Sequence, residues 1–382
     1  MNEMERNVRI DLIKGISIIL MVIGHSGAPS FTSFIYLFHM AIFFIASGYL
    51  YDHTYSNSIQ SLSRFIKRKV KSLWFPFVLW NTIFSILHNF FIDVNVYTNN
   101  EMFLVYGGGK YNQLTQYWNI NDIIKCSVKS IFFASDVQIG GAFWFFKILF
   151  VLSIMYASLE YIWVKIYSNN DSVIFQTILS ILLLFVGYYF SIKNINIFSI
   201  QIVFSCYCLY HLGVLFKYKK ENVGWQLKKM SVPPSRLHLI LLISSFGLLI
   251  IFSNYGSISL GSNFYPNPIF MLLSSFLGWV FVSEIAYYIE KSDMCKRCFI
   301  IVGNETRSIM VLHFLCFKII SYFIVICKNR PYYLVASFPV IREGTLWWVA
   351  YTIIGIVLPI FLHKLWNYYI KKLFSFKDKA EL

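Results

Sequence analysis

The sequence contains ten apolar runs, each 17 to 23 residues long, separated by more polar connections. A bilayer core about 30 Å thick needs roughly 20 apolar residues per helical span, so runs of this length are typical of transmembrane helices. Hydrophobic residues make up 57% of the chain and charged residues only 13%, which could not coat a water-soluble domain of 382 residues. The sequence therefore predicts an all-α, polytopic transmembrane bundle of about ten helices. The expected spans are 11–28, 33–51, 73–92, 142–164, 173–191, 198–216, 238–254, 267–288, 304–326 and 345–366.

These spans leave little room for a separate soluble domain. We expect one transmembrane domain over residues 1–366, followed by a short basic tail over 367–382. One connection, 93–141, is much longer than the others and contains three consecutive glycines at 107–109. Long loops of compact folds are often functional, so this segment could cap an outward-facing site or be a passive loop.

The net charge of +15 is concentrated on one side of the predicted bundle. Segment 52–72 holds five basic residues and segment 217–237 holds six, whereas the opposite connections hold only a scatter. The positive-inside rule then places both termini in the cytoplasm and the protein in the cell (inner or plasma) membrane. The same rule accounts for the charge, so no nucleic-acid partner is expected.

The cysteines predict neither a disulfide framework nor a metal site. They are seven in number and lie mostly in or near the spans. Cys295 and Cys298 form a lone C-x-x-C without a second ligand pair, which argues against zinc. We expect no metal and no prosthetic group.

The first span carries two chemically capable side chains on one helical face. Lys14 and His25 are eleven residues apart. At 3.6 residues per turn this is close to three turns, so the two lie roughly 16 Å apart along one stripe. Lys14 could instead snorkel to the interface, and His25 could be an interfacial polar residue. Ionisable groups within a membrane are nevertheless costly and commonly functional.

A second histidine, His39, lies near the outer end of the next span. The connection between the two spans is only a few residues long, so they form an antiparallel hairpin with His25 and His39 at similar depth. Neutral imidazole near pH 7 can remove a hydroxyl proton as the hydroxyl attacks a thioester. We predict that both histidines are catalytic and that one of them is the base.

Short motifs follow one another in order along most of the chain. Lys14 is followed by ten residues and His25, and residues 39–50 fit the pattern H-x-x-x-F-F-x-x-S-G-Y-L. Three further motifs lie at 68–76, 141–146 and 303–313. Together these motifs resemble the acyltransferase 3 family of membrane-bound O-acyltransferases.

The sequence departs from the family pattern at two cations. It has lysine at Lys14 and Lys71, where arginine also occurs or is the commoner residue. Lysine keeps the positive charge but lacks the planar bidentate fork, so a phosphate contact there is less directional.

The resemblance implies transfer of an acyl group, usually acetyl from acetyl-coenzyme A as donor substrate, to a hydroxyl of a cell-surface or lipid-linked glycan. It implies a donor site at Lys14, Arg68 and Lys71, although positive-inside topology also favours basic residues there. Acceptor-binding or supporting roles are expected for Asp11, Trp144, Phe145, Lys147, Arg307 and His313. The expected partners are the acyl-coenzyme A donor, the glycan acceptor and the bilayer, while homo-oligomer formation stays open.

Rival interpretations come from other classes. A transporter or flippase of polar lipid-linked glycans would use the intramembrane charges to line a path and would not need His25 as a base. An acyltransferase acting on a small-molecule acceptor fits the same residues. A structural or sensory membrane protein would leave the paired histidines unexplained.

Overall fold

The computed structural model describes residues 7–29, 31–106, 113–134, 137–167, 172–223, 234–342 and 346–380. Side chains are described for the same residues except 219–223, 234–235 and 370–380. The basic side chains of 219, 220, 228 and 229 and the glycines at 107–109 therefore lie outside the described residues.

Helices dominate the described residues, whose one strand-like pairing is an isolated bridge between Ser259 and Phe264. This confirms the predicted all-α fold. The helices are α1 (Val8–His25), α2 (Phe31–Tyr36), α3 (His39–Tyr49), α4 (Ile59–Lys69), α5 (Phe75–Ile86), α6 (His88–Asp93), α7 (Met102–Tyr106), α8 (Ile120–Ile131), α9 (Trp144–Tyr167), α10 (Ser172–Ile192), α11 (Ile200–Val223), α12 (Pro234–Tyr255), α13 (Pro268–Glu290), α14 (Asp293–Asn304), α15 (Thr306–Cys327) and α16 (Trp347–Ala380). Short 3-10 or π turns are η1 (His53–Ser56), η2 (Val70–Trp74), η3 (Gln138–Gly140), η5 (Leu260–Ser262) and η6 (Tyr332–Ala336).

Eight segments of the described chain are long and apolar enough to cross a membrane. They correspond to eight of the ten expected spans, and the other two correspond to α1 and α5. Helix α1 has 18 residues but carries Arg9, Asp11 and Lys14, and α5 has only 12 residues. The protein is thus a multi-pass membrane protein. Of the two expected spans outside these eight segments, α1 carries more charge than a typical transmembrane helix and α5 is shorter than one.

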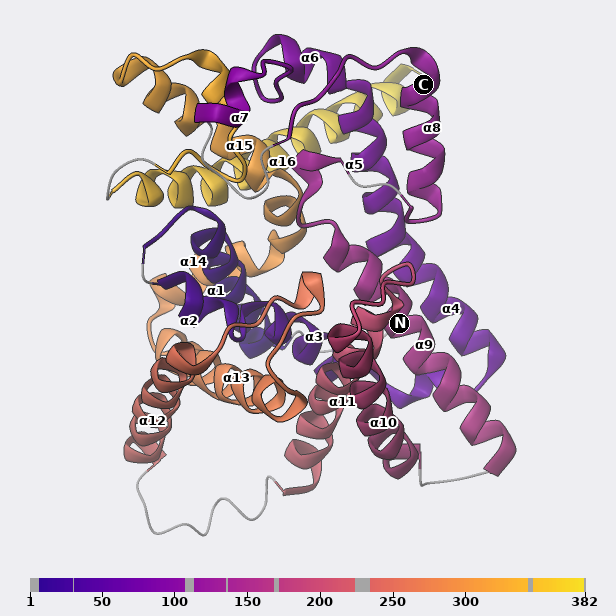
Figure 1. Cartoon of the computed structure of the whole chain (residues 1–382). Helices are drawn as coiled ribbons and strands as arrows, with labels where there is room; N and C mark the ends of the chain where they lie inside the picture. Colours follow the sequence, from indigo (N-terminus) through magenta and orange to yellow (C-terminus); the bar gives the residue numbers. More distant parts are fainter. Residues whose placement is uncertain are drawn as a thin grey trace.

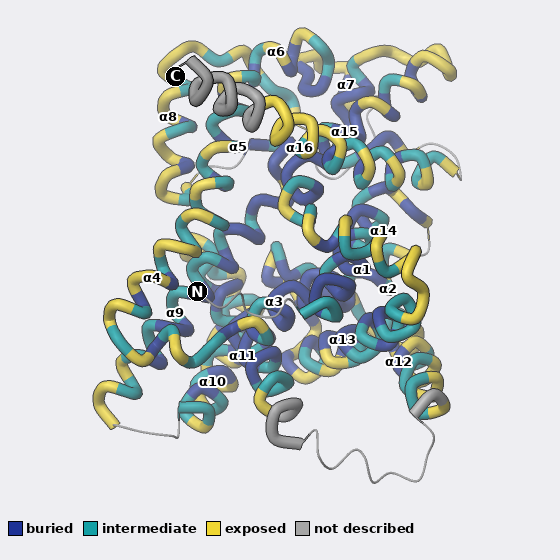
Figure 2. Tube along the Cα trace, turned by 180° about the vertical axis from the view of Figure 1, so that it is seen from behind, coloured by how far each residue is buried: buried dark blue, intermediate teal, exposed yellow. Residues whose placement is uncertain are grey.

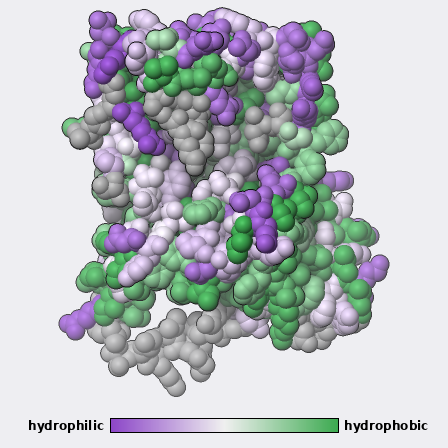
Figure 3. Space-filling model, in the orientation of Figure 1, coloured by the Kyte–Doolittle hydropathy of each residue, from purple (hydrophilic) through white to green (hydrophobic). Residues whose placement is uncertain are grey.

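We call the side where α1 begins proximal and the side where it ends distal. Polar contacts join the proximal ends of helices: Arg9 forms an ion pair with Glu290 at 3.6 Å, and Nδ1 of His238 lies within hydrogen-bond distance of Glu284 at 2.6 Å. The proximal ends of α9, α10, α11 and α12 gather at the bottom of Figure 1, and α6, α7 and α8 lie at its top. Hydrophilic residues crowd the top of this view, whereas hydrophobic ones cover much of the lower part (Figure 3).

Helix α1 lies inside the bundle and positions His25 at its distal end. Asn7 caps the helix by accepting a hydrogen bond from the backbone N–H of Ile10 at 3.3 Å. Helix α1 contacts α3, α13, α14, α15 and α16, and it is among the most buried helices in Figure 2. Its backbone approaches α14 closely, because a Cβ at Gly15 would clash with the carbonyl of Phe299 and one at Gly303 with the carbonyl of Asp11. Glycine at both positions therefore allows this approach.

Helices α4 and α5 join through the π turn η2 into one rod beside α9 (Figure 1). Within the long 93–141 connection, α8 packs along α5, where Trp74 donates to the carbonyl of Ile131 at 3.0 Å. One face of α8 exposes Ile120, Ile124 and Val128, as expected for a face turned to lipid. The described part of this connection therefore includes an amphipathic helix of the bundle.

Candidate active site

A cavity of about 700 Å³ lies among the distal segments of the bundle. The end of α1, the α1–α3 connection and the start of α3 form one wall, and residues from 141–144, 258–262 and 338–342 form the others. These segments are distant in sequence, so only the folded bundle creates the cavity. Both histidines singled out from sequence, His25 and His39, line it.

A third histidine orients His25. This histidine is His313 in α15. Nδ1 of His25 lies 3.2 Å from Nε2 of His313, and the centroids of the two rings are 5.4 Å apart in a stacked arrangement. Nδ1 of His313 lies 2.9 Å from the carbonyl oxygen of Ile309, which can only accept a hydrogen bond. The network thus assigns the proton of neutral His313 to Nδ1, so that its Nε2 accepts from Nδ1 of His25. Nε2 of His25 therefore carries a lone pair that can accept a proton.

His39 is held in the same way by a backbone carbonyl. Its Nδ1 donates to the carbonyl oxygen of Ile35 at 2.9 Å, and the ring is 3% exposed. The ring of Tyr36 packs near both cavity histidines, with its centroid 6.3 Å from that of His25 and 4.9 Å from that of His39. One cavity is therefore lined by two imidazoles whose Nδ1–H groups are engaged and whose Nε2 atoms carry lone pairs.

A buried lysine outside the cavity lining holds the segment that forms another of its walls. Lys318 in α15 is 2% exposed, and its Nζ donates to the carbonyl oxygens of Val335 and Ser337 at 3.1 and 2.7 Å. A buried ammonium group needs such acceptors because its desolvation is otherwise costly. These bonds fix the segment that leads into Phe338, which lines the cavity.

The two aromatic residues predicted at this end of α9 occupy different surroundings. Trp144 lines the cavity and offers an indole ring there. Phe145 is buried instead and packs against Phe43 and Phe44, with ring centroids 5.6 and 5.1 Å away. Consecutive residues of a helix point about 100° apart, which explains why only one of them lines the cavity.

The remaining supporting residues predicted from sequence lie away from the cavity walls. Nζ of Lys147 donates to the carbonyl of Phe133 at 3.0 Å and to Oγ of Ser199 at 3.3 Å. Arg307 is exposed in the first turn of α15, at its proximal end. Asp11 is buried and forms an ion pair with Lys14 at 2.8 Å within α1.

The three cations predicted to bind the donor do not form one cluster. Lys14 belongs to α1, whereas Arg68 is exposed on α4 with its guanidinium 4.5 Å from the centroid of the Tyr55 ring. Lys71 follows in the π turn and is also exposed. Helices α1 and α4 are separated in both views of the molecule (Figures 1 and 2). A donor site that uses all three would have to extend across the proximal side.

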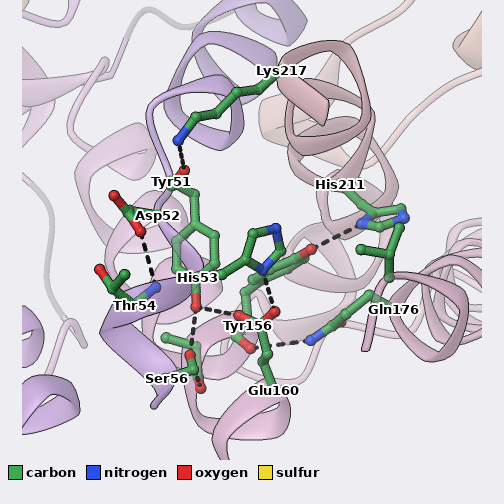
Figure 4. Close-up of polar contacts among 12 residues, drawn as sticks. Tyr51, Asp52, His53, Thr54, Ser56, Tyr156, Glu160, Gln176, His211 and Lys217 are labelled. Carbon is green, nitrogen blue, oxygen red and sulfur yellow. Dashed lines mark hydrogen bonds and ion pairs between the residues drawn. The ribbon is translucent and has the colours of Figure 1, made fainter. Parts of the chain in front are cut away.

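A buried polar network on the proximal side was not singled out by the sequence. Figure 4 shows Tyr51 and His53 both pointing towards Glu160 of α9. Tyr51 donates to Oε2 of this carboxylate at 2.6 Å, and Nδ1 of His53 lies 2.5 Å from Oε1. The hydrogen bond with Glu160 raises the pKa of His53 above 6.5. Ser56 completes this part by bonding the hydroxyl of Tyr51 at 2.6 Å.

A second group of hydrogen bonds lies beside this one, around a buried histidine of α11, and the two groups meet where the rings of Tyr51 and Tyr156 pack with centroids 5.0 Å apart. His211 accepts or donates at both ring nitrogens, with Nδ1 2.9 Å from the hydroxyl of Tyr156 and Nε2 2.8 Å from the hydroxyl of Thr177. Both nitrogens are therefore engaged, unlike those of the cavity histidines. This arrangement ties α9, α10 and α11 to the turn that follows α3.

Comparison with known proteins gives one match. A family model described as an acyltransferase domain matches residues 7–364, nearly the whole chain. No curated protein and no solved structure matches the sequence.

Proposed function

The chain belongs to the acyltransferase 3 family, and we propose that it transfers acetyl from acetyl-coenzyme A to a hydroxyl group of a cell-surface or lipid-linked glycan. The observation that carries this proposal is the orientation of His25. Its Nδ1–H is engaged by His313 at 3.2 Å, so its Nε2 is the atom that can accept a proton in the cavity.

The proposed step is direct transfer. Nε2 of His25 removes the hydroxyl proton of the acceptor while the hydroxyl oxygen attacks the thioester carbonyl carbon. The new C–O bond forms, the C–S bond breaks, and the coenzyme A sulfur leaves as a thiolate, which takes the proton from Nε2 of His25 and so restores the neutral imidazole. His313 accepts the hydrogen bond from Nδ1–H throughout and so supports the imidazolium that forms on His25.

The other cavity residues suit an acceptor with several hydroxyl groups. The lone pair on Nε2 of His39 can accept a hydrogen bond from a neighbouring hydroxyl, and Ser259 and Ser262 add polar groups to the opposite wall. The indole of Trp144 offers an apolar face of the kind on which a sugar ring can pack. These features support a saccharide acceptor on the distal side.

The donor is proposed to enter from the proximal side, which we take to be cytoplasmic. The basic residues of 52–72 and 217–237 favour this orientation, with both termini in the cytoplasm. Exposed Arg68 and Lys71 would hold the anionic phosphates of coenzyme A, and Lys14 would lie along the path towards His25. The thioester would then reach the cavity from the opposite side to the acceptor.

Reconstituted liposomes test this proposal. Acetyl-coenzyme A labelled on its acetyl group is supplied on one side and a panel of oligosaccharides on the other. The proposal predicts label on the saccharide in a base-labile ester and free coenzyme A on the donor side. Movement of unlabelled saccharide without ester formation would instead identify a transporter.

A further inference from the structure

A second cavity of about 460 Å³ lies between α8, the start of α6 and the segments around 113–118 and 137–138. It has no role in the step proposed above. Its lining is strongly polar and includes the side chains of Gln113, Gln116 and Gln138. Amide groups of this kind both donate and accept hydrogen bonds, which suits a ligand rich in hydroxyl groups.

The aromatic wall of this second cavity is held rigidly. Asn89 bonds the backbone of Trp118 on both sides, accepting from its N–H at 2.8 Å and donating to its carbonyl at 2.8 Å. One face of the indole stacks on His88, with ring centroids 3.6 Å apart. His88 is fixed in turn by a bond from Nε2 to the carbonyl of Gln116 at 3.0 Å. A wall fixed in this way loses little freedom when a ligand binds.

The charge of the second cavity is positive at its rim. Lys125 and Lys129 of α8, one helical turn apart, line the cavity and are exposed, on a different side of the helix from the exposed stripe of Ile120, Ile124 and Val128. Among the described residues of the lining, the one carboxylate is that of Asp122, which already accepts from the backbone of Asn119 in a capping box. Arg342 likewise lines the first cavity. Both distal cavities therefore present cations to whatever occupies them.

The two cavities are neighbours along the chain. Gln138, the first residue of η3, lines the second cavity, and Gly141, the residue after η3, lines the first. Three residues of a 3-10 helix advance by about 6 Å, so one short turn separates the two linings at this point. An elongated ligand that reaches over η3 can therefore occupy both cavities.

We propose that the second cavity is an acceptor subsite that binds a neighbouring, negatively charged sugar unit of the same saccharide whose hydroxyl is acylated beside His25. The acceptor is thus an acidic oligosaccharide or polysaccharide rather than a single sugar. Amides of the lining bind its hydroxyl groups, and Lys125 and Lys129 bind its carboxylate or phosphate. This inference rests on the proposed function for the identity of the acceptor.

The test measures binding and transfer separately. The full-length protein in lipid nanodiscs is offered neutral and carboxylate-bearing oligosaccharides of one to four units, and the affinity of each is determined. We expect the acidic saccharides of two or more units to bind most tightly. Lys125→Gln combined with Lys129→Gln should weaken that binding by about tenfold, as expected when charge-assisted hydrogen bonds are lost. Gln138→Leu should weaken it by a smaller factor.

Lys193→Gln is the matched control, because this exposed lysine follows α10 on the same distal side and lines neither cavity. It should leave binding unchanged, and none of the variants should change the KM for acetyl-coenzyme A. Affinity that is independent of saccharide length, or unchanged by the Lys125 and Lys129 substitutions, would overturn the subsite. Length-dependent binding that the substitutions weaken, in a protein that transfers no acetyl group, would retain the subsite and refute the proposed function instead.

Discussion

The distal cavity and the proximal Glu160 network both hold histidines inside a lipid-embedded bundle, but they satisfy them differently. In the proximal network both ring nitrogens of His211 are engaged by side chains, and the Glu160 carboxylate is bonded by Tyr51 and His53. In the distal cavity His313 engages Nδ1 of His25, whose Nε2 keeps a lone pair that can accept a proton. A fully engaged imidazole contributes to folding, whereas one with an oriented lone pair beside a cavity can perform chemistry.

The largest effect on stability is expected from Glu160→Leu. The substitution removes two charge-assisted hydrogen bonds from a carboxylate that is 1% exposed, so the free energy of unfolding should fall by about 3 kcal/mol. Unfolding in detergent, monitored by temperature or denaturant, measures the change. The kcat of the molecules that remain folded should stay close to that of the wild type. A stable Glu160→Leu protein with a strongly reduced kcat would show that the proximal network belongs to the reaction.

His313→Leu sharpens the comparison from the distal side. Loss of the acceptor for Nδ1–H of His25 frees the ring to rotate and removes support for its protonated form. Partners that orient other functional histidines commonly contribute about 10- to 100-fold in activity, and a similar loss of kcat is expected here. His313→Gln offers an acceptor oxygen and should recover part of the rate. Equal losses in both variants would point to a role in folding rather than in orientation.

Substitution of the cations proposed to bind the donor should raise the KM for acetyl-coenzyme A and leave kcat nearly unchanged. Arg68→Ala or Lys71→Ala should weaken donor binding by an amount on the order of 1–3 kcal/mol, the usual range for a charge-assisted hydrogen bond. Arg64→Ala is a matched control because Arg64 is exposed on the same helix one turn earlier. Unchanged donor affinity in both variants would leave these cations with only their topological role.

The smallest expected effect is on the pH dependence of stability. Because the hydrogen bond with Glu160 raises the pKa of His53 in the folded protein, this pair stabilises the fold fully below pH 6.5. The contribution is lost as the pH rises through the raised folded-state pKa. His53→Gln lacks this contribution. Its free energy of unfolding should therefore be lower than that of the wild type below pH 6.5, and it should fall less than that of the wild type as the pH rises through this interval. An identical pH profile in the two proteins would exclude the ion pair as a source of stability.

Much of the fold could be predicted from sequence because lipid imposes a simple rule on helix length and composition. The rule is weakest for α1, whose charges Arg9, Asp11 and Lys14 are partly neutralised by ion pairs with Glu290 and within the helix. This rule also gives no indication that α8 turns back along α5. The alternation of lipid-facing and polar residues in α8 is typical of any amphipathic helix and does not specify its partner.

The site was predictable only in its local part. His25 and His39 lie in adjacent spans, so their shared depth follows from a short hairpin. The partnership of His25 with His313 joins residues 288 positions apart and depends on how α15 packs against α1. Glu160 was not singled out because a single acidic residue near a helix end is common at a membrane interface. Its function as the centre of a network depends on contacts between distant elements.

The most direct test compares His25→Ala with His211→Ala in purified protein, measuring acetyl transfer per folded molecule together with the melting temperature. We expect His25→Ala to melt close to the wild type and to lose transfer by about 10²-fold or more, as expected when a positioned base is removed. His211→Ala should melt at a lower temperature and keep its transfer rate per folded molecule. Near wild-type transfer by correctly folded His25→Ala would contradict the assignment of His25 as the base.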